Sequence, residues 1–571
     1  MSYFYMKEAW IFRLSTWWIG NDLTWSNHLI KVVDTYWREL IICLEDWLIQ
    51  GSLAEDSKMA YDARHEIMKK VHTHVLSHIH TDHGGWYVTS QAVWALPKNA
   101  KILCPHIVKQ QSRIVLPVWF ALQQREEWKA NGISKRIANE HLTLNRLERL
   151  YQDMNDKECF EMNDYLFHSQ NDWWSSKERI REKKFEKNKS KRNSLHKLYK
   201  WVKDNYNLMR EWWIKDVHDV QNVISQRKNH IDVNKQKLES IQLNALTKWT
   251  LKDLENTLNK FIWIDFDVPH IISESPKVSI TFKRSNHMLW ASMILIETDL
   301  WTMLYTWDVP RIIWNRFLPW PDFRINKTID YLLMESTYWN RLHQKTYEEW
   351  VKVLQNIIRN HKPWSFSLIV NISSRGPEIG CITLEELIRN KSNELLNILW
   401  RTNQEFLKLA IQHWWNKYNL YNTHKDKYVS WIFASENIIP WIYMSTAWFL
   451  AGISLEMAKS IASDPNSQII FTSYVPKSMP WYRLIHENII DSLDGTEPIP
   501  FLWKVYQIDW LSGHGDQSDL LNFRKKLGMP YTELVHGDLE AKAELKLKME
   551  QQPWNKNRIE IAEWMERKKV L

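Results

Sequence analysis

The sequence predicts an α/β protein, and the distribution of apolar and polar residues along the chain indicates this class. Short apolar runs bounded by turns fill residues 8–90, as is typical of strands. A polar, charged stretch from about 125 to 245 is almost free of glycine and proline, which predicts a long helical insertion. From about 341 to 505, helical and strand-like segments alternate, which predicts a smaller α/β domain. A chain of 571 residues can form more than one domain.

The first strands are expected at Ile30–Val33, Leu40–Leu44 and His74–Leu76, where apolar residues cluster between turns. A helical stretch from about 94 to 124 should follow and cover their sheet, because apolar residues recur there around Ile107 and Leu122. The N-terminal part is therefore predicted to begin with strands.

An apolar run ending at Leu76 is followed by the sequence Ser-His78-Ile-His80-Thr-Asp82-His83-Gly-Gly. A turn after a buried strand can aim alternate side chains at one point, as a site with several ligands requires. Imidazole and carboxylate groups together suit zinc or a similar divalent ion, and four ligands this close in sequence can serve two ions. The alternative is a histidine-rich surface turn, but the HxHxDH pattern is far more specific than a lone histidine.

Tryptophan is unusually frequent and glycine unusually rare. The chain has 36 Trp and 13 Gly, whereas an average glycine content of about 7% would give roughly 40. Several tryptophans stand in turns or beside motif residues, where a side chain is unfavourable, as at Trp17, Trp18, Trp25, Trp86 and Trp307. We hypothesise that the gene uses the opal codon for glycine and that this codon is read here as tryptophan. The alternative is a truly tryptophan-rich protein.

The surplus of positive charge is concentrated in the predicted insertion. Between Lys177 and Lys200 there are eleven Lys or Arg and three Glu, a surplus of eight that equals the formal net charge of +8 of the whole chain. Such a segment could hold a phosphate backbone, or it could be a solvated helix or loop. From Leu195 to Ile224 apolar residues recur in steps of three and four, which predicts an amphipathic helix, or a hairpin if Trp212 and Trp213 are glycines.

A cytoplasmic protein is expected. No apolar run reaches the roughly 18 residues of a membrane span, and the N-terminus lacks a signal pattern. The cysteines are isolated, so neither a disulfide framework nor a thiolate zinc site is indicated; they are Cys43, Cys104, Cys159 and Cys381.

Within the α/β segment expected at about 341–505, helices are predicted at Tyr347–Ile358 and Leu384–Leu407. Apolar strands are predicted at Ser367–Asn371 and Gln468–Ser473.

The motif from His78 to Gly85 resembles the metal motif of the metallo-β-lactamase superfamily. Three later segments resemble its β-CASP branch, nucleases that process RNA or DNA: Glu335 to Tyr338, Ser512 to Gln517 and Val535 to Asp538. Within that branch the chain resembles the bacterial and archaeal relatives of the cleavage and polyadenylation endonuclease and, more distantly, RNase J. These motifs occur in the family's order, and the resemblance covers most of the chain except roughly 125–245. It also implies glycine at Trp47, Trp290, Trp339, Trp481 and Trp510.

The resemblance implies a metallo-β-lactamase αββα sandwich with an inserted β-CASP α/β domain and a long helical insertion. On this reading residues 1–340 form the first part of the metallo-β-lactamase domain, with the basic helical insertion at about 125–245. Residues 341–504 form the β-CASP cap domain, and 505–571 complete the metallo-β-lactamase domain.

The resemblance also implies a site for two zinc ions, with manganese as an alternative metal. One ion would be held by His78, His80 and His287, the other by Asp82, His83 and His536, with Asp308 as the bridge. The catalytic residues would be His514 as general acid, Asp82, and Glu335, the acidic residue that opens the β-CASP domain. The family's first acidic residue is normally Asp. Here Glu45 stands in its place, and whether Glu45 or Asp46 takes its role is open.

The expected activity is hydrolysis of RNA phosphodiester bonds by a two-zinc ribonuclease, because His536 is typical of the RNA-acting branch whereas the DNA-acting branch tends to have valine. The alternatives are a β-CASP DNA repair nuclease or a non-catalytic scaffold subunit, although such scaffolds lose metal ligands that this sequence keeps. The expected partner is RNA, and no association with a membrane is expected. The insertion could bind RNA or a partner protein. The sequence leaves open whether the enzyme acts as an endonuclease or an exonuclease and which RNA it cleaves. It also leaves open the oligomeric state, for which a homodimer is one possibility.

Overall fold

The structure is a computed structural model with two compact units, Met1–Ala121 with Thr247–Leu571, and Leu122–Leu246. The residues it describes are 6–16, 25–34, 38–45, 69–80, 84, 87–88, 91, 96–155, 217–244, 250–285, 287–309, 311, 317, 325, 327–338, 342, 345–362, 364–371, 375–399, 401–413, 415–432, 442–446, 458, 462, 464–472, 475, 480–490, 499–501, 504–508, 513–535, 539–553, 555, 558–561 and 567–569.

The first sheet has the strand order β22-β1-β2-β3-β4-β5-β6. Strands β3 to β6 run parallel, so the carboxyl ends of β3 and β4 lie at the same edge. Glu45 directly follows β3, and His78 comes shortly after β4. The strands are β1 (Met6–Thr16), β2 (Trp25–Asp34), β3 (Glu39–Leu44), β4 (Thr73–Val75), β5 (Lys101–Pro105), β6 (Phe261–Ile264) and β22 (Arg567–Lys569).

The second sheet has the order β21-β20-β11-β10-β9-β8-β7. Strands β10, β11, β20 and β21 are parallel, so Asp308, Glu335 and Val535 follow neighbouring strand ends. The strands are β7 (His270–Glu274), β8 (Lys277–Arg284), β9 (Ser292–Thr298), β10 (Thr302–Trp307), β11 (Tyr331–Met334), β20 (Tyr531–Leu534) and β21 (Ile559–Ile561).

These two sheets pack face to face, because one buried cluster draws side chains from both, such as Ile42 and Val75 from the first and Ile294 and Tyr305 from the second. Helix α9 (Leu251–Lys260) and the start of α4 (His106–Asn155) cover the outer face of the first sheet. Helices α16 (Gln517–Lys526) and α17 (Leu539–Glu550) cover the second. The predicted αββα sandwich is thus confirmed.

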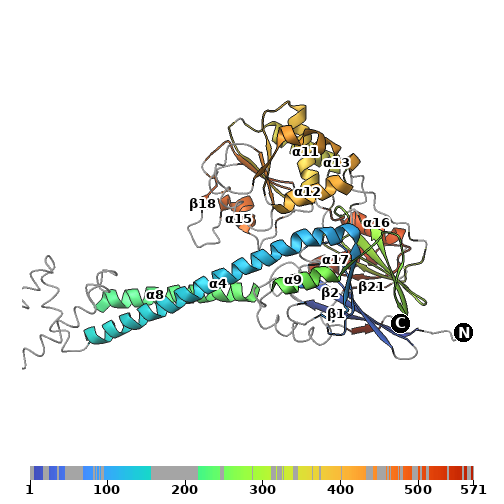
Figure 1. The fold of residues 1–571 in the computed structure, drawn as a ribbon, viewed down its shortest axis with the longest axis horizontal. Coiled ribbons are helices and arrows are strands. Elements are labelled where there is room, and N and C mark those ends of the chain that lie inside the picture. Colours follow the sequence, from blue (N-terminus) through green and yellow to red (C-terminus); the bar gives the residue numbers. More distant parts are fainter. Residues whose placement is uncertain are drawn as a thin grey trace, which may run out of the picture. The chain divides into compact units, whose positions relative to one another are not determined.

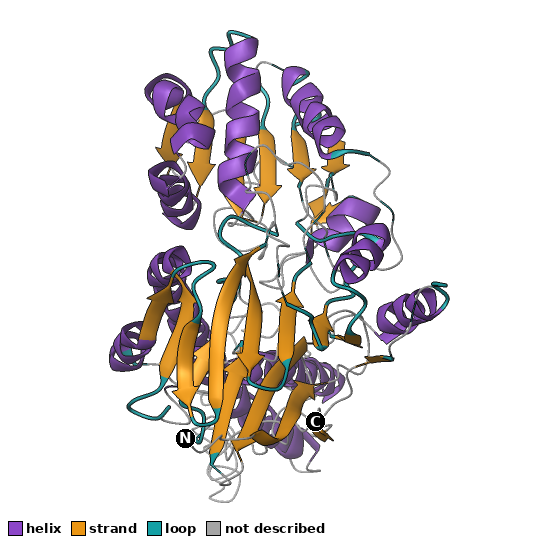
Figure 2. Cartoon of the chain, turned by 90° about the vertical axis from the view of Figure 1, so that its right-hand side faces the viewer, coloured by secondary structure: helices purple, strands orange, loops and turns teal. Residues whose placement is uncertain are grey.

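A third sheet has the order β14-β13-β15-β12-β16-β19, with all neighbouring strands parallel. Alternate side chains of its strands face opposite sides. Ile369 packs toward α10, α11, α12 and α13, whereas Leu368 packs toward α15 (Figure 2). The elements are α10 (Tyr347–Arg359), β12 (Ser367–Asn371), α11 (Gly376–Arg389), β13 (Leu396–Leu399), α12 (Arg401–His413), α13 (Trp415–Tyr428), β14 (Val429–Ile432), β15 (Ile442–Thr446), β16 (Gln468–Phe471), α15 (Pro480–Glu487) and β19 (Lys504–Gln507), with a small pair β17 (Ile489–Ile490) and β18 (Ile499–Pro500).

The smaller unit contains the outer part of α4 and helix α8 (Val217–Asn244), which run side by side (Figure 1). Arg227 of α8 contacts both carboxylate oxygens of Glu140 at 2.7 Å, and Lys228 lies 3.1 Å from Glu148. The basic stretch 177–200 lies outside the described residues. None of the described helices, these long ones included, is apolar enough over sufficient length to cross a membrane.

Two sequence-based expectations need correction. The stretch predicted as helical from 94 to 124 contains strand β5 before α4 begins, and the predicted helix Leu384–Leu407 is interrupted by strand β13. Both strands are short and apolar, and periodicity alone cannot separate such a run from a buried helix. Strand β19 pairs with β16, so the third sheet extends to Gln507.

Two tryptophans have backbone conformations that favour glycine. Trp290 has a φ of 69° and Trp364 a φ of 65°, a left-handed region that bulky residues rarely adopt. Trp290 is buried, whereas Trp364 is 86% exposed. Trp86, Trp339 and Trp510 lie outside the described residues.

Candidate metal centre

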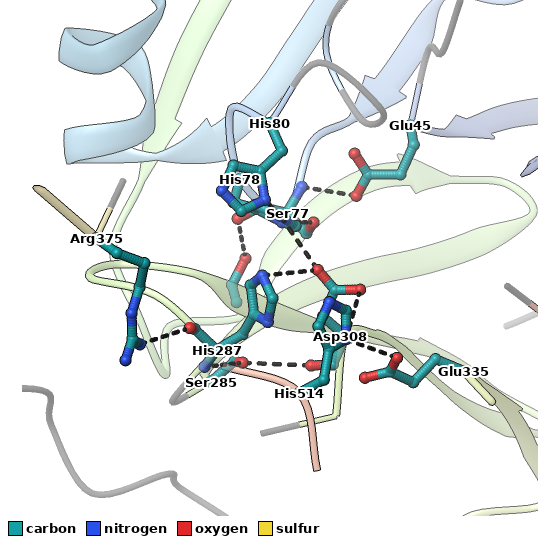
Figure 3. A network of polar contacts seen from close by, with 11 residues as sticks. Glu45, Ser77, His78, His80, Ser285, His287, Asp308, Glu335, Arg375 and His514 are labelled. Atoms are coloured by element: carbon teal, nitrogen blue, oxygen red, sulfur yellow. Dashed lines mark hydrogen bonds and ion pairs between the residues drawn. The ribbon is translucent and has the colours of Figure 1, made fainter. Parts of the chain in front are cut away.

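Four predicted ligands from distant parts of the chain meet at one edge of the sandwich. His78 and His80 follow β4, His287 lies in the loop between β8 and β9, and Asp308 follows β10. Figure 3 shows the three imidazoles directed toward the carboxylate of Asp308. Within each sheet, parallel strands place segments far apart in sequence at one edge: Glu45 and His78 in the first sheet, Asp308 and Glu335 in the second.

The separations between the ligand atoms suit a metal ion. His78 Nε2 lies 2.9 Å from His80 Nδ1 and 3.3 Å from Asp308 Oδ2. His287 Nε2 lies 3.1 Å from the same oxygen, and the four ligand atoms all lie within 4.8 Å of one another. Ligand atoms on a tetrahedral zinc ion with bonds of about 2.1 Å would be roughly 3.4 Å apart. The residues therefore fit this ion.

The surroundings of His80 and His287 favour neutral imidazoles. Burial lowers the pKa of His287 well below its ordinary value, and the nearby Asp308 carboxylate offsets this only in part. Burial also lowers the pKa of His80, helped by His78, although the residue is only partly buried. A neutral imidazole has a lone pair for a metal, so binding would not have to displace a proton at neutral pH.

His514 and Glu335 form a second group of side chains beside these four ligands. His514 Nδ1 lies 2.8 Å from Glu335 Oε2 and 3.8 Å from Asp308 Oδ1. Burial raises the pKa of Glu335, and the His514 imidazole partly lowers it again. The Glu335 side chain is fully buried while 17% of the His514 side chain is exposed. The carboxylate therefore orients a ring that reaches solvent.

Glu45 supports the loop that carries His78 and His80. Its carboxylate accepts a hydrogen bond from the Ser77 backbone N–H at 2.9 Å, and Ser77 Oγ lies 2.8 Å from His78 Nδ1. Glu45 is fully buried and has a φ of 63°. Asp46, the alternative for the first acidic position, lies outside the described residues.

Three predicted ligands, Asp82, His83 and His536, lie outside the described residues, so their assignment to a second ion stays a prediction. The neighbouring backbone is described. Val535 donates a hydrogen bond from its N–H to the Met334 carbonyl at 2.8 Å. The residue before His536 is therefore joined to the strand that leads to Glu335.

Sequence reasoning did not identify two residues that contact His287. A Cβ added at Gly513 would lie 1.8 Å from the His287 carbonyl oxygen, so the two backbones touch. Arg375 Nη1 donates to the same oxygen at 3.2 Å. Gly513 stands in a motif that the sequence indicated, in a chain poor in glycine. Nothing in the sequence around Arg375 indicates its contact.

Parts of the chain are similar to known proteins. The family model of the RMMBL domain, described as a Zn-dependent metallo-hydrolase RNA specificity domain, matches residues 498–558. An RNase J-like protein of Methanocaldococcus jannaschii is 24% identical over 316 residues, which is 52% of this chain and 72% of that protein. These similarities support the resemblance to the β-CASP branch of the metallo-β-lactamase superfamily.

Two further relatives are matched over a smaller share of their length. The transcription termination factors FttA of Methanothermobacter thermautotrophicus and Thermococcus kodakarensis are 23% and 26% identical, over 54% and 48% of this chain. The match spans about half of their length, 51% and 45%. A solved structure of a protein of unknown function from Enterococcus faecalis V583 has a TM-score of 0.45 at 11% identity, covering 99% of this chain and all of that one, a likeness too weak to bear on function.

Proposed function

We propose that this β-CASP protein is a two-zinc ribonuclease that hydrolyses phosphodiester bonds of RNA. The observation that carries the proposal is the cluster of His78, His80, His287 and Asp308 next to the pair of His514 and Glu335. The match to an RNA specificity domain and the RNase J-like relative support RNA as substrate.

The metal ligands are assigned from the geometry and the family motif together. His78 Nε2, His80 Nδ1 and His287 Nε2 would hold one zinc ion, and Asp308 would bridge to a second ion held by Asp82, His83 and His536. Two bound zinc ions supply an activated water at neutral pH and stabilise negative charge on the phosphoryl oxygens. Manganese, which also accepts imidazole and carboxylate ligands, would serve as an alternative.

His514 is assigned as general acid. Because its Nδ1 faces Glu335, its Nε2 is the ring nitrogen that can give a proton to the leaving oxygen. Glu335 fixes the orientation of the ring through its contact at 2.8 Å with Nδ1. The partial exposure of His514 lets a substrate approach this nitrogen.

The test uses protein with the native residue at each tryptophan position and three substrates of one sequence: linear RNA with a labelled 5′ monophosphate or triphosphate, circular RNA, and single-stranded DNA. We expect zinc-dependent cleavage of RNA with DNA cut much more slowly. Cleavage of the circle would show endonuclease action, whereas cutting of linear RNA alone would show exonuclease action. Preferred cleavage of DNA would instead support a DNA repair nuclease. A zinc-loaded protein that cleaves none of the substrates would support a scaffold role.

A further inference from the structure

The backbone of His287 is held by side chains on both sides. Its N–H donates to Ser285 Oγ at 3.1 Å, and its carbonyl oxygen accepts from Arg375 Nη1 at 3.2 Å. The same carbonyl lies against the Gly513 backbone. His287 is outside the regular strands, between β8 and β9, so the direction of its ring depends on these contacts.

Arg375 is itself held from a second direction. It is buried, with 8% exposure, at the start of α11, and its Nη2 lies 2.9 Å from Glu378 Oε2 one turn later. The other oxygen of Glu378 accepts a hydrogen bond from the Tyr347 hydroxyl. A buried guanidinium needs a neutralising partner, and Glu378 provides one. The planar fork of arginine can contact a carboxylate and a carbonyl at once, which the single ammonium of lysine does less well.

The start of α11 has little room to shift. A Cβ at Gly376 would lie 2.8 Å from Asn403 Oδ1 and 3.1 Å from Asn371 Nδ2, so the backbone beside Arg375 packs directly on two buried side chains. Asn371 ends β12 and Asn403 lies in α12. Arg375 is therefore fixed to the framework of the third sheet, and Figure 3 shows its guanidinium directed at the His287 carbonyl.

We propose that Arg375 is a positioning residue, which couples the third sheet to the metal centre by fixing the loop that presents His287. The guanidinium contacts the His287 backbone carbonyl and Glu378, not the imidazole. It therefore supports the loop without competing with a metal for the ring. The inference rests on the proposed function only in taking His287 as a metal ligand. Loss of partners that orient metal ligands typically lowers metal affinity about 10- to 100-fold.

The test compares Arg375→Met, Arg375→Lys and Arg389→Met, with zinc affinity measured by competition with a chromogenic chelator. Arg389 lies on the same helix, pairs with Glu386 at 2.6 Å and is half-exposed, which makes it a matched control. We expect zinc affinity to fall about 10- to 100-fold in Arg375→Met, to fall less in Arg375→Lys, and to stay unchanged in Arg389→Met. Turnover per zinc-loaded enzyme should fall in Arg375→Met while KM for RNA changes little.

Several outcomes would overturn the proposal. Unchanged zinc affinity in Arg375→Met would do so, and so would an equal loss in Arg389→Met. A rise in KM alone would make Arg375 a substrate-binding residue instead. If Arg375→Met does not fold, Glu378→Gln keeps the arginine but removes its neutralising charge, and unchanged zinc affinity there would count equally against the proposal. If zinc affinity follows the expected pattern but the wild-type protein cleaves no RNA, the ribonuclease proposal fails and the role of Arg375 stands.

Discussion

Replacing Gly513 by alanine should disrupt the candidate metal centre through a single added methyl group. The new Cβ would lie 1.8 Å from the His287 carbonyl oxygen, 2.6 Å from its carbonyl carbon and 2.9 Å from Nδ1 of its ring, whereas ordinary contact begins at 3.4 Å. The two loops would have to separate by about 1.6 Å, the difference between 3.4 and 1.8 Å. The clash is with backbone, so no flexible side chain can turn away to relieve it.

The expected cost has two parts. Overpacking typically destabilises a fold by about 1–3 kcal/mol, and we expect the upper end here because backbone must move. Displacement of His287 by more than 1 Å would also disturb its alignment with Asp308, and a misplacement of about 1 Å can lower catalytic rate about 100-fold. Urea unfolding of the metal-free protein measures the first part, and zinc affinity with single-turnover RNA cleavage measures the second.

Gly132→Ala provides the control. Gly132 lies inside α4 and nothing lies within 4 Å of the position where its Cβ would be. Alanine there should leave stability unchanged or raise it by up to about 1 kcal/mol, because glycine is unfavourable in a helix. Wild-type stability and zinc affinity in Gly513→Ala would refute the close approach of these two loops.

Other predictions follow from the same site. His514→Ala should keep its zinc but lose a factor of about 10² to 10⁴ in turnover, the usual contribution of a general acid; an equal loss of metal would show that its role is different. The metal-free protein should lose stability as the pH falls below about 6.5. The unfolded chain then binds protons at His80 and His287, whose pKa burial lowers in the folded state. Urea midpoints at pH 7.5 and 5.5 measure this loss, which should be smaller in His287→Asn; a loss of the same size in that variant would contradict the assignment. The natural protein should carry glycine at Trp86, Trp307, Trp339 and Trp510; positive φ supports glycine at Trp290 as well and adds Trp364. Expression with tryptophan at these sites should give poorly soluble, inactive protein. Peptide mass spectrometry on protein from its native cells decides this, and tryptophan at Trp307 and Trp510 in an active enzyme would end the recoding hypothesis.

The sequence allowed part of the site to be predicted because His78 and His80 lie together after one strand. His287, Asp308, Glu335 and His514 are single residues far apart in the chain, and only the family resemblance singles them out. The structure places them together because Asp308 and Glu335 follow neighbouring parallel strands, and the loops that carry His287 and His514 lie beside them.

What could not be predicted depends on close contacts between distant segments. From the sequence alone, Glu45 and Asp46 are equal candidates for the family's first acidic position. In the structure, Glu45 has a left-handed backbone conformation and its carboxylate accepts a hydrogen bond from the Ser77 N–H. The contacts of Gly513 and Arg375 with His287 depend on backbone spacing within about an ångström, which no residue pattern encodes. Strand β13 was missed because its four residues, three of them apolar, carry no distinct period.

The most direct test of the account is a zinc titration of metal-free protein in which RNA cleavage is followed at each ratio of zinc to protein. We predict that cleavage rises to a plateau at about two equivalents. Asp308→Ala should bind less zinc at both sites and cleave no RNA, because its carboxylate contacts His78 and His287 and lies beside His514. Full cleavage without zinc, or normal zinc content in Asp308→Ala, would contradict a two-metal ribonuclease centred on this carboxylate.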